Sequence, residues 1–235
     1  MQHVLGLAMD FADWITTNSL VPYQFAVQFM EQRVTEIRLG EKRELVWLLE
    51  HPPIYTKGST ANRTELLGKP KLPVFETGRG GRYTYHGPGQ RVIYVMLDLQ
   101  NRNLDVRRYV NHLEQWLIDS LSIFNIDAER RPGRIGIWVV RSNGSEAKVG
   151  AIGVRIRRSV SFHGASLNID PDLDHYKGIV PCGISDHDIT SVSDLGLNVK
   201  MQEMDKALRQ TFKKIFGEIT DTDSPHIPAS DLEFM

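Results

Sequence analysis

The chain has 235 residues, 41% hydrophobic and 24% charged, which is the composition of a soluble globular protein large enough to bury a full core. Its 28 basic and 29 acidic residues give a net charge of −1, which argues against a general nucleic-acid binder. The single cysteine excludes an intramolecular disulfide, and the sequence has neither a membrane-length apolar run nor a signal or transit peptide. We therefore expect a cytoplasmic protein that acts neither on nucleic acid nor in a membrane.

Helix and strand patterns interleave irregularly in the first half of the chain. A helix is predicted between Pro22 and Gly40, because apolar residues recur there at spacings of three and four and glycine suits a helix C-terminus. Residues 45–49 and 92–97 are predicted to be buried strands, the first ending at a His-Pro-Pro break. Asp105 is predicted to cap a longer helix.

The second half adds strands predicted at 135–140, 148–158 and 160–169 and a helix at 203–216. The irregular order of these elements favours a mixed α/β (α+β) fold. The simplest arrangement is a single domain over residues 1–219. The polar segment 220–235, which contains two prolines, is predicted to be a loose tail.

The first chemically dense segment is residues 79–90, Arg-Gly-Gly-Arg-Tyr-Thr-Tyr-His-Gly-Pro-Gly-Gln. Its glycines allow the main chain to approach a ligand closely, and its polar side chains offer many donors. The spacing fits neither a phosphate-binding loop nor a dinucleotide fingerprint. A polar connection between strands with a solvated histidine explains the same composition.

Lys148 and Cys182 are the candidate reactive side chains. In a strand, Lys148 lies on an otherwise apolar face, so either its ammonium reaches water at the strand end or its pKa is depressed and it has a function. Cys182 lies between Pro181 and Gly183 on a predicted turn and is either a nucleophile or an inert buried thiol. No metal-binding histidine pair occurs, so we expect no metal site. No serine-hydrolase motif occurs either.

Taken together, these segments resemble the signature of the lipoyl (octanoyl) transferase family of lipoate biosynthesis. The resemblance covers about residues 18–215 and rests on segment 79–90 together with four others: 51–56, 148–154, 161–168 and 181–184. The chain departs from the pattern at Arg91, where an aliphatic residue is expected, and at Ser166, where alanine is expected. Both departures concern local substrate contacts.

The resemblance implies a mixed sheet flanked by helices, similar to the catalytic domains of lipoate and biotin protein ligases. It also implies octanoyl transfer from acyl carrier protein to a lysine of lipoyl domains, in 2-oxoacid dehydrogenase complexes and the glycine cleavage carrier protein, with no cofactor. Cys182 matches the family's acyl-thioester nucleophile, and Lys148 matches the lysine that lowers its pKa and acts as acid and base. The implied substrate-binding residues are Arg79, Gly80, Gly81, Arg82, Tyr83, Thr84, Tyr85, His86, Ala151, Ile152, Gly153, Gly164, Ala165 and Ser166.

Three other functions are distinguishable by experiment. An ATP-dependent lipoate-protein ligase would need ATP and magnesium and would not need Cys182. A non-catalytic module that binds the carrier protein would keep its affinity when Cys182 is removed. A cysteine hydrolase would release free octanoate instead of modifying a protein lysine.

Overall fold

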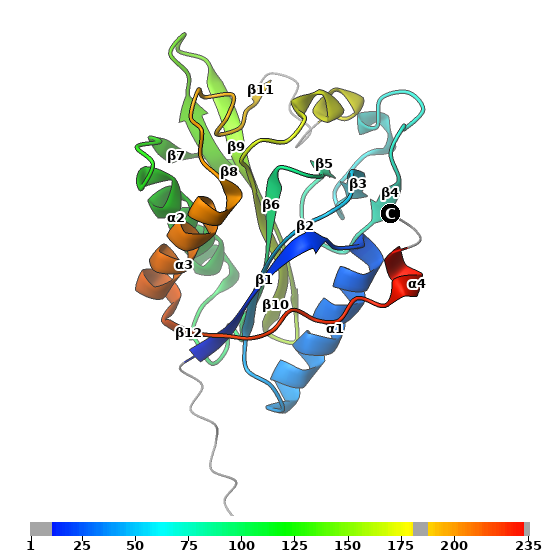
Figure 1. Ribbon diagram of the computed structural model, residues 1–235, viewed down its shortest axis with the longest axis vertical. Helices are drawn as coiled ribbons and strands as arrows, with labels where there is room; N and C mark the ends of the chain where they lie inside the picture. The colour runs from blue at the N-terminus through cyan, green and yellow to red at the C-terminus, as the bar shows by residue number, and fades with distance from the viewer. Residues whose placement is uncertain (1–10, 181–187, 233–235) are drawn as a thin grey trace, which may run out of the picture.

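A large mixed sheet forms the middle layer of the protein, and helices cover both of its faces (Figure 1). The computed structural model describes residues 11–180 and 188–232. In this part of the chain the strand order is β12-β1-β2-β6-β10-β9-β8-β7, with β11 paired to β9. The strands are β1 (Phe11–Leu20), β2 (Leu45–Glu50), β6 (Gln90–Met96), β7 (Ala128–Arg131), β8 (Arg134–Val140), β9 (Glu146–Arg157), β10 (Val160–Asn168), β11 (Asp188–Ile189) and β12 (Glu218–Asp221).

Strand directions in this sheet are mixed. β1 runs parallel to β2 and β12, whereas β6 is antiparallel to β2 and β10, and β9 is antiparallel to β10 and β8. The mixed α/β fold predicted from the sequence is confirmed.

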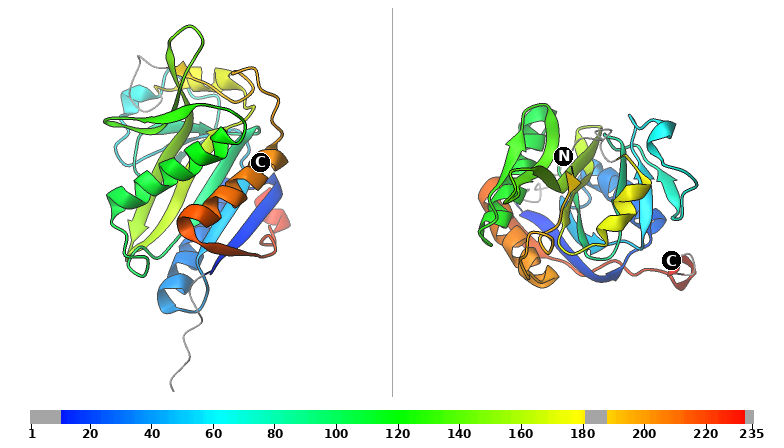
Figure 2. Two further views of the ribbon diagram at one scale, coloured as in Figure 1. Left: turned by 90° about the vertical axis from the view of Figure 1, so that its left-hand side faces the viewer. Right: turned by 90° about the horizontal axis from the view of Figure 1, so that it is seen from above.

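Helix α1 (Tyr23–Leu39) covers one face of the sheet, and α2 (Val106–Ser122) and α3 (Met201–Phe216) pack together on the other (Figures 1 and 2). The predicted helix ends are confirmed: Gly40 is left-handed with φ 72°, and the Asp105 side chain accepts a hydrogen bond from the backbone nitrogen of Arg108 at 2.8 Å. None of the helices formed by the described residues is long and apolar enough to cross a bilayer.

A smaller sheet stands beside the large one, in the order β4-β3-β5. Its strands are β3 (Ile54–Lys57), β4 (Val74–Glu76) and β5 (Tyr83–His86). Strand β5 lies within the glycine-rich segment, so part of this segment is regular structure rather than a connection. Two 3₁₀ helices flank this region, η1 (Arg63–Glu65) and η2 (Leu173–Gly178).

The chain after α3 differs from the loose tail predicted from residue 220. Strand β12 crosses that boundary and pairs in parallel with β1, and the Ser224 hydroxyl lies 2.9 Å from that of Thr17. The physical reason is that β1 is otherwise an edge strand, and its unpaired backbone groups are satisfied by the returning chain. The short helix α4 (Ala229–Leu232) follows beside α1 (Figure 1).

Candidate active site

Lys148 lies near the start of β9, beside the neighbouring strand β8. Only 5% of the residue is exposed. Its Nζ donates a hydrogen bond to the backbone oxygen of Ile135 at 3.0 Å and lies 4.8 Å from the centre of the Trp138 ring. The side chain therefore lies inside the fold and does not reach water at the strand end, which excludes the first of the two alternatives that the sequence left open, and a function for Lys148 stays a prediction.

Gly136 makes room for this lysine. A Cβ at this position would lie 3.0 Å from Lys148 Cε and 2.9 Å from the backbone oxygen of Gly150. The glycine also has φ 130°, which side-chain-bearing residues rarely adopt. The absence of a side chain at position 136 therefore leaves the space that Lys148 occupies beside β8.

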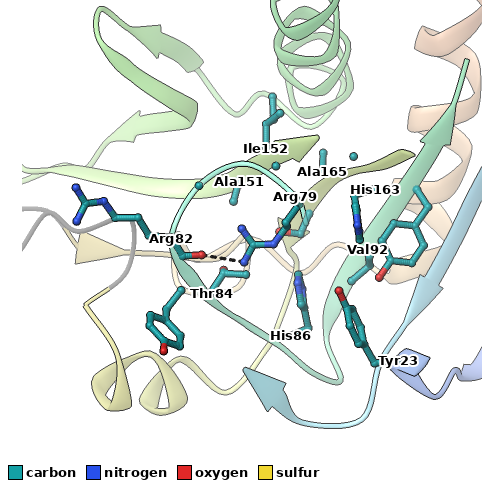
Figure 3. Close-up of a pocket in the computed structure, with 16 residues that line it drawn as sticks. Tyr23, Arg79, Arg82, Thr84, His86, Val92, Ala151, Ile152, His163 and Ala165 are labelled. Carbon is teal, nitrogen blue, oxygen red and sulfur yellow. Dashed lines mark hydrogen bonds between the residues drawn. The ribbon is translucent and has the colours of Figure 1, made fainter. Parts of the chain in front are cut away.

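Two adjoining cavities lie along β9 and β10. Lys148 borders the smaller one. The larger encloses about 560 Å³ of space including its mouth and lies between the glycine-rich segment and the two strands (Figure 3). Thr84, Ala151 and Ser166 border both cavities, so the larger cavity leads toward Lys148.

Most of the substrate-binding residues implied by the sequence line the larger cavity. They are Arg79, Gly81, Arg82, Tyr83, Thr84, His86, Ala151, Ile152, Gly153, Gly164, Ala165 and Ser166. Gly80 and Tyr85 lie behind its wall instead. The backbone nitrogen of Gly80 donates to the oxygen of Val154 at 2.9 Å, which fastens the glycine-rich segment to β9. Tyr85 packs edge-to-face on Tyr176, with ring centroids 5.5 Å apart.

Four residues of the cavity wall were not in the predicted set: Tyr23, Val92, Tyr94 and His163. Val92 and Tyr94 are two and four residues after Gln90, so the period of a strand places all three on one face of β6. His163 lies within one of the segments that carry the family resemblance. Tyr23 comes from the first turn of α1, and we find no signal in the sequence that connects it to the cavity.

Arg79 is the best-anchored side chain of the glycine-rich segment. Its guanidinium donates to the backbone oxygen and the hydroxyl of Thr56, at 3.0 and 2.8 Å, and to the backbone oxygen of Arg82 at 2.9 Å (Figure 3). Only 8% of the residue is exposed. These bonds tie the segment to β3 and fix one wall of the cavity.

Three histidines in and behind this wall are held neutral. Burial lowers the pKa of His51 to about 4, and burial, with smaller contributions from nearby positive charge, lowers the pKa of His86 and His163 to about 3. The Nδ1 of His51 donates to the backbone oxygen of Val21 at 2.6 Å, so its Nε2 accepts from the Tyr94 hydroxyl at 2.7 Å. At neutral pH these rings are uncharged, which suits an uncharged acyl group.

The two departures from the family signature have different positions. Arg91 points away from the cavity, is 2% exposed, and forms an ion pair with Asp205 of α3 at 2.8 Å. Its contribution is therefore to the packing of α3 on β6. Ser166 borders both cavities, so this departure does touch the candidate substrate path.

Cys182, with Pro181 and Gly183, lies outside the described residues, and its role as nucleophile stays a prediction. The residues that follow this segment are described. β11 pairs in parallel with β9, which places Ile189 opposite Lys148, and the backbone nitrogen of Thr190 donates to the oxygen of Lys148 at 3.0 Å.

Known proteins match this chain over most of its length. Residues 22–213 match the family described as the lipoyl protein ligase A/B catalytic domain. A Brucella melitensis protein named octanoyltransferase is 56% identical over 213 residues, covering 87% of this chain and 81% of that one. A protein of the same name from Paramagnetospirillum magneticum is 56% identical over 205 residues, covering 87% and 97%.

Solved structures agree on the fold. A lipoate-protein ligase A bound with ATP superposes with a TM-score of 0.72 at 14% identity, covering 95% of this chain and 92% of that one. An archaeal bi-partite lipoate protein ligase from Thermoplasma acidophilum gives 0.69 at 16% identity, covering 96% and 90%. Structural similarity at 14–16% sequence identity establishes only the fold, whereas the sequence matches above 50% identity establish the family. The chain belongs to the lipoyl protein ligase A/B catalytic family, and within it to the octanoyltransferases.

Proposed function

We propose that this enzyme transfers an octanoyl group from acyl carrier protein to a lysine of a lipoyl domain, through a thioester on Cys182. The observation that carries the proposal is the buried Lys148 side chain on the smaller cavity, which shares Thr84, Ala151 and Ser166 with the larger cavity that most residues of the family signature line. The natural acceptors would be the lipoyl domains of 2-oxoacid dehydrogenase complexes and the glycine cleavage carrier protein, in the cytoplasm. The lone thiol fits a reducing compartment.

The first step exchanges one thioester for another. A thiol with a pKa near ~8.5 is only a few per cent ionised at neutral pH, so a nearby cation that favours the thiolate raises its reactivity. The Cys182 thiolate attacks the octanoyl carbonyl and the carrier thiolate leaves. The leaving sulfur takes up the proton that the Lys148 cation gives up, which leaves Lys148 neutral for the second step. Thioester exchange is close to neutral in free energy, so this step requires no ATP.

The second step forms the amide. The amine of the acceptor lysine must be deprotonated to attack the acyl-cysteine, and Lys148 in its neutral form is the proposed base. Collapse of the tetrahedral intermediate expels the Cys182 thiolate and leaves the octanoyl-lysine product. Amide formation from a thioester is downhill, which drives the transfer to completion.

The larger cavity is the proposed acyl site. Each methylene removed from water contributes ~0.8 kcal/mol, so the fit of an eight-carbon chain can select its length without polar contacts. Close-packed backbone shapes part of the wall: a Cβ on Gly164 of β10 would lie 2.2 Å from the backbone oxygen of Ile93 in β6, and one on Gly153 of β9 would lie 3.2 Å from the oxygen of Gly80. Main chain at these glycines therefore limits the space available for the acyl chain, together with the side chains that line the cavity.

Intact-protein mass spectrometry after mixing with octanoyl carrier protein, without ATP, tests the proposal. We expect an octanoyl adduct on the wild type, its absence in Cys182→Ala, and its transfer to an added apo lipoyl domain. An adduct that persists in the alanine variant would falsify the assignment of the nucleophile. Transfer that requires ATP and magnesium would establish a ligase, and release of free octanoate would establish a hydrolase.

A further inference from the structure

A buried polar cluster forms part of the wall of the smaller cavity, which Asn168 and Tyr176 line, and we call its members Gln90, Asn168, Tyr176 and Thr190 the anchoring network. The Nε2 of Gln90 lies 2.9 Å from both Asn168 Oδ1 and the Tyr176 hydroxyl, and this hydroxyl donates to Asn168 Oδ1 at 3.3 Å. The Nδ2 of Asn168 donates to the backbone oxygen of Thr190 at 2.9 Å. All four residues are buried. The network joins β6, β10, η2 and the segment after β11, which are far apart in the sequence.

Carbonyl oxygens fix the orientation of both amides. The Nε2 of Gln90 also faces the backbone oxygen of Tyr85 at 3.1 Å, and a carbonyl can only accept, so the nitrogen must point there. The Gln90 oxygen then accepts from His86 Nδ1 at 2.6 Å. The same reasoning applies to Asn168, because Thr190 presents a carbonyl. Neither side chain can rotate without losing its partners, which makes the network rigid.

The upstream arm of the network reaches the chain just before residue 181. Tyr176 belongs to η2, and four residues later Val180 donates its backbone nitrogen to the oxygen of Glu65 at 2.7 Å. Gly178 accepts from the backbone nitrogen of Leu67 at 2.9 Å. This flank is therefore fixed both by the network and by main-chain bonds to the end of η1.

The downstream arm holds the chain that follows residue 187. Asn168 binds it twice, through its side chain to Thr190 and through its backbone oxygen, which accepts from the nitrogen of Val192 at 3.0 Å. The backbone nitrogen of Thr190 donates to the oxygen of Lys148 at 3.0 Å. The downstream flank is thus fixed both to Asn168 and to Lys148, the candidate base.

We propose that Asn168 is a positioning residue for octanoyl transfer: it ties both flanks of segment 181–187, through Tyr176 and Thr190, to the strand that borders the acyl cavity. The inference rests on the proposed function, because that function places the nucleophile Cys182 between the two flanks. Asn168 need not touch the substrate. Its effect is on how often the thiol and Lys148 are in the geometry required for reaction, to which reaction rates are steeply sensitive.

Two variants test the network, one on both arms and one on the upstream arm alone. Asn168→Ala removes the side-chain bonds to Gln90, to Tyr176 and to the Thr190 oxygen, while Tyr176→Phe removes a single hydroxyl from the upstream arm and conserves the ring. Ser120→Ala is the matched control, because its hydroxyl lies 2.6 Å from that of Thr211 in the equally buried contact between α2 and α3, remote from the site. It removes a buried hydrogen bond without touching either flank.

The measurements are acyl-adduct formation by mass spectrometry and alkylation of the thiol against pH, which reports only on Cys182 because the chain has one cysteine. We expect Asn168→Ala to slow adduct formation about 10- to 100-fold and Tyr176→Phe about 3- to 10-fold, with the alkylation profile displaced and the KM for the donor within about twofold of wild type. Ser120→Ala should lose a similar amount of thermal stability and keep both profiles.

Each alternative outcome is informative. If the wild type forms the adduct and both network variants form it at the wild-type rate, the positioning role is refuted while the proposed function stands. If slowing in the variants follows their loss of stability in the same proportion as in Ser120→Ala, the network is merely structural and the inference is likewise refuted. If the wild type itself forms no adduct on Cys182, it is the proposed function that fails.

Discussion

Replacing Gly136 by alanine should inactivate the enzyme by moving Lys148 without altering any reactive group. The added methyl would lie 3.0 Å from Lys148 Cε, 3.1 Å from its Nζ and 2.9 Å from the Gly150 oxygen. The Gly150 contact involves backbone of the central sheet, which yields little, so the lysine must give way. Its hydrogen bond to the Ile135 oxygen would be lost or lengthened.

The loss of stability expected for Gly136→Ala is the sum of two costs in free energy. A side-chain-bearing residue at positive φ costs roughly 1–2 kcal/mol, and an extra methyl in a packed site costs roughly 1–3 kcal/mol more. Gly133, in the turn between β7 and β8, separates them: it has φ 76°, and a Cβ there would meet nothing within 4 Å. Gly133→Ala should therefore show only the backbone cost of a left-handed residue, which is smaller than the cost at φ 130°. The added methyl alone should lower the Tm of Gly136→Ala by roughly 2–12 °C relative to Gly133→Ala for a chain of this length, and the less favourable φ lowers it further.

The decisive assay compares octanoyl transfer by Gly136→Ala and Gly133→Ala at a temperature where both are folded. Displacing a catalytic group by up to about 1 Å can cost about 100-fold, so we expect a 10- to 100-fold loss in the first variant and near wild-type activity in the second. Equal activity in the two variants, with the expected difference in Tm, would refute a catalytic role for the observed position of Lys148.

The remaining predictions concern the lysine, the buried histidines and one glycine. Lys148→Met should move the alkylation profile of the single thiol to higher pH, and an unchanged profile would count against the pairing of lysine and cysteine. Burial lowers the pKa of His51 to about 4 and of His86 and His163 to about 3, whereas a histidine in the unfolded chain has a pKa of about 6.5. As the pH falls below that value, the unfolded chain therefore binds protons before the folded protein does. The contribution of these histidines to the free energy of unfolding should therefore be complete above pH 6.5 and fall by roughly 1.4 kcal/mol per pH unit per histidine down to about pH 4. Urea titrations from pH 7.5 to 4.5 measure this fall, and its absence would contradict the neutral, buried state of the three rings. Gly164→Ala should destabilise the fold by at least roughly 3 kcal/mol, because the added methyl cannot fit between β10 and β6. Thermal unfolding tests this, and a Tm within about 2–3 °C of wild type would show that the two strands separate more easily than their packing indicates.

Strong local patterns carried most of the fold prediction. The helices at residues 23–39 and 106–122 and the strands β2, β6, β8, β9 and β10 were all predicted to within a few residues, because each has a continuous apolar run, an alternation of apolar with other residues, or a helical repeat. Strand β1 was missed. Its sequence mixes polar residues such as Asp13 and Thr17 with apolar ones, and these are buried only because Arg33 and Trp47, distant in the sequence, supply partners for them. Such pairing is tertiary and leaves no local signal.

The site was predictable where one segment of sequence supplies one wall of the cavity. The glycine-rich segment and the two central strands contain most of the wall, and the resemblance identified them. What local reasoning cannot supply is the meeting of distant residues: Tyr23 reaches the cavity only because α1 starts where β1 ends, and the buried Lys148 is placed by Ile135 and Trp138 of another strand. These contacts depend on strand order, which periodicity does not determine.

The arrangement also explains how one architecture can serve both ligases and transferases. A lysine held in the sheet beside an acyl cavity is useful to either chemistry, because both end in an amide with a protein lysine. A transferase needs in addition a thiol near that lysine, and here the segment that contains Cys182 is joined to the fold by two fixed flanks, one at Glu65 and one at Lys148 itself. A nucleophile can therefore be introduced between anchored ends without rebuilding the sheet. On the proposed function, the anchoring network serves this mode of addition, since fixed flanks limit the positions that a thiol between them can take and so favour its encounter with the acyl group.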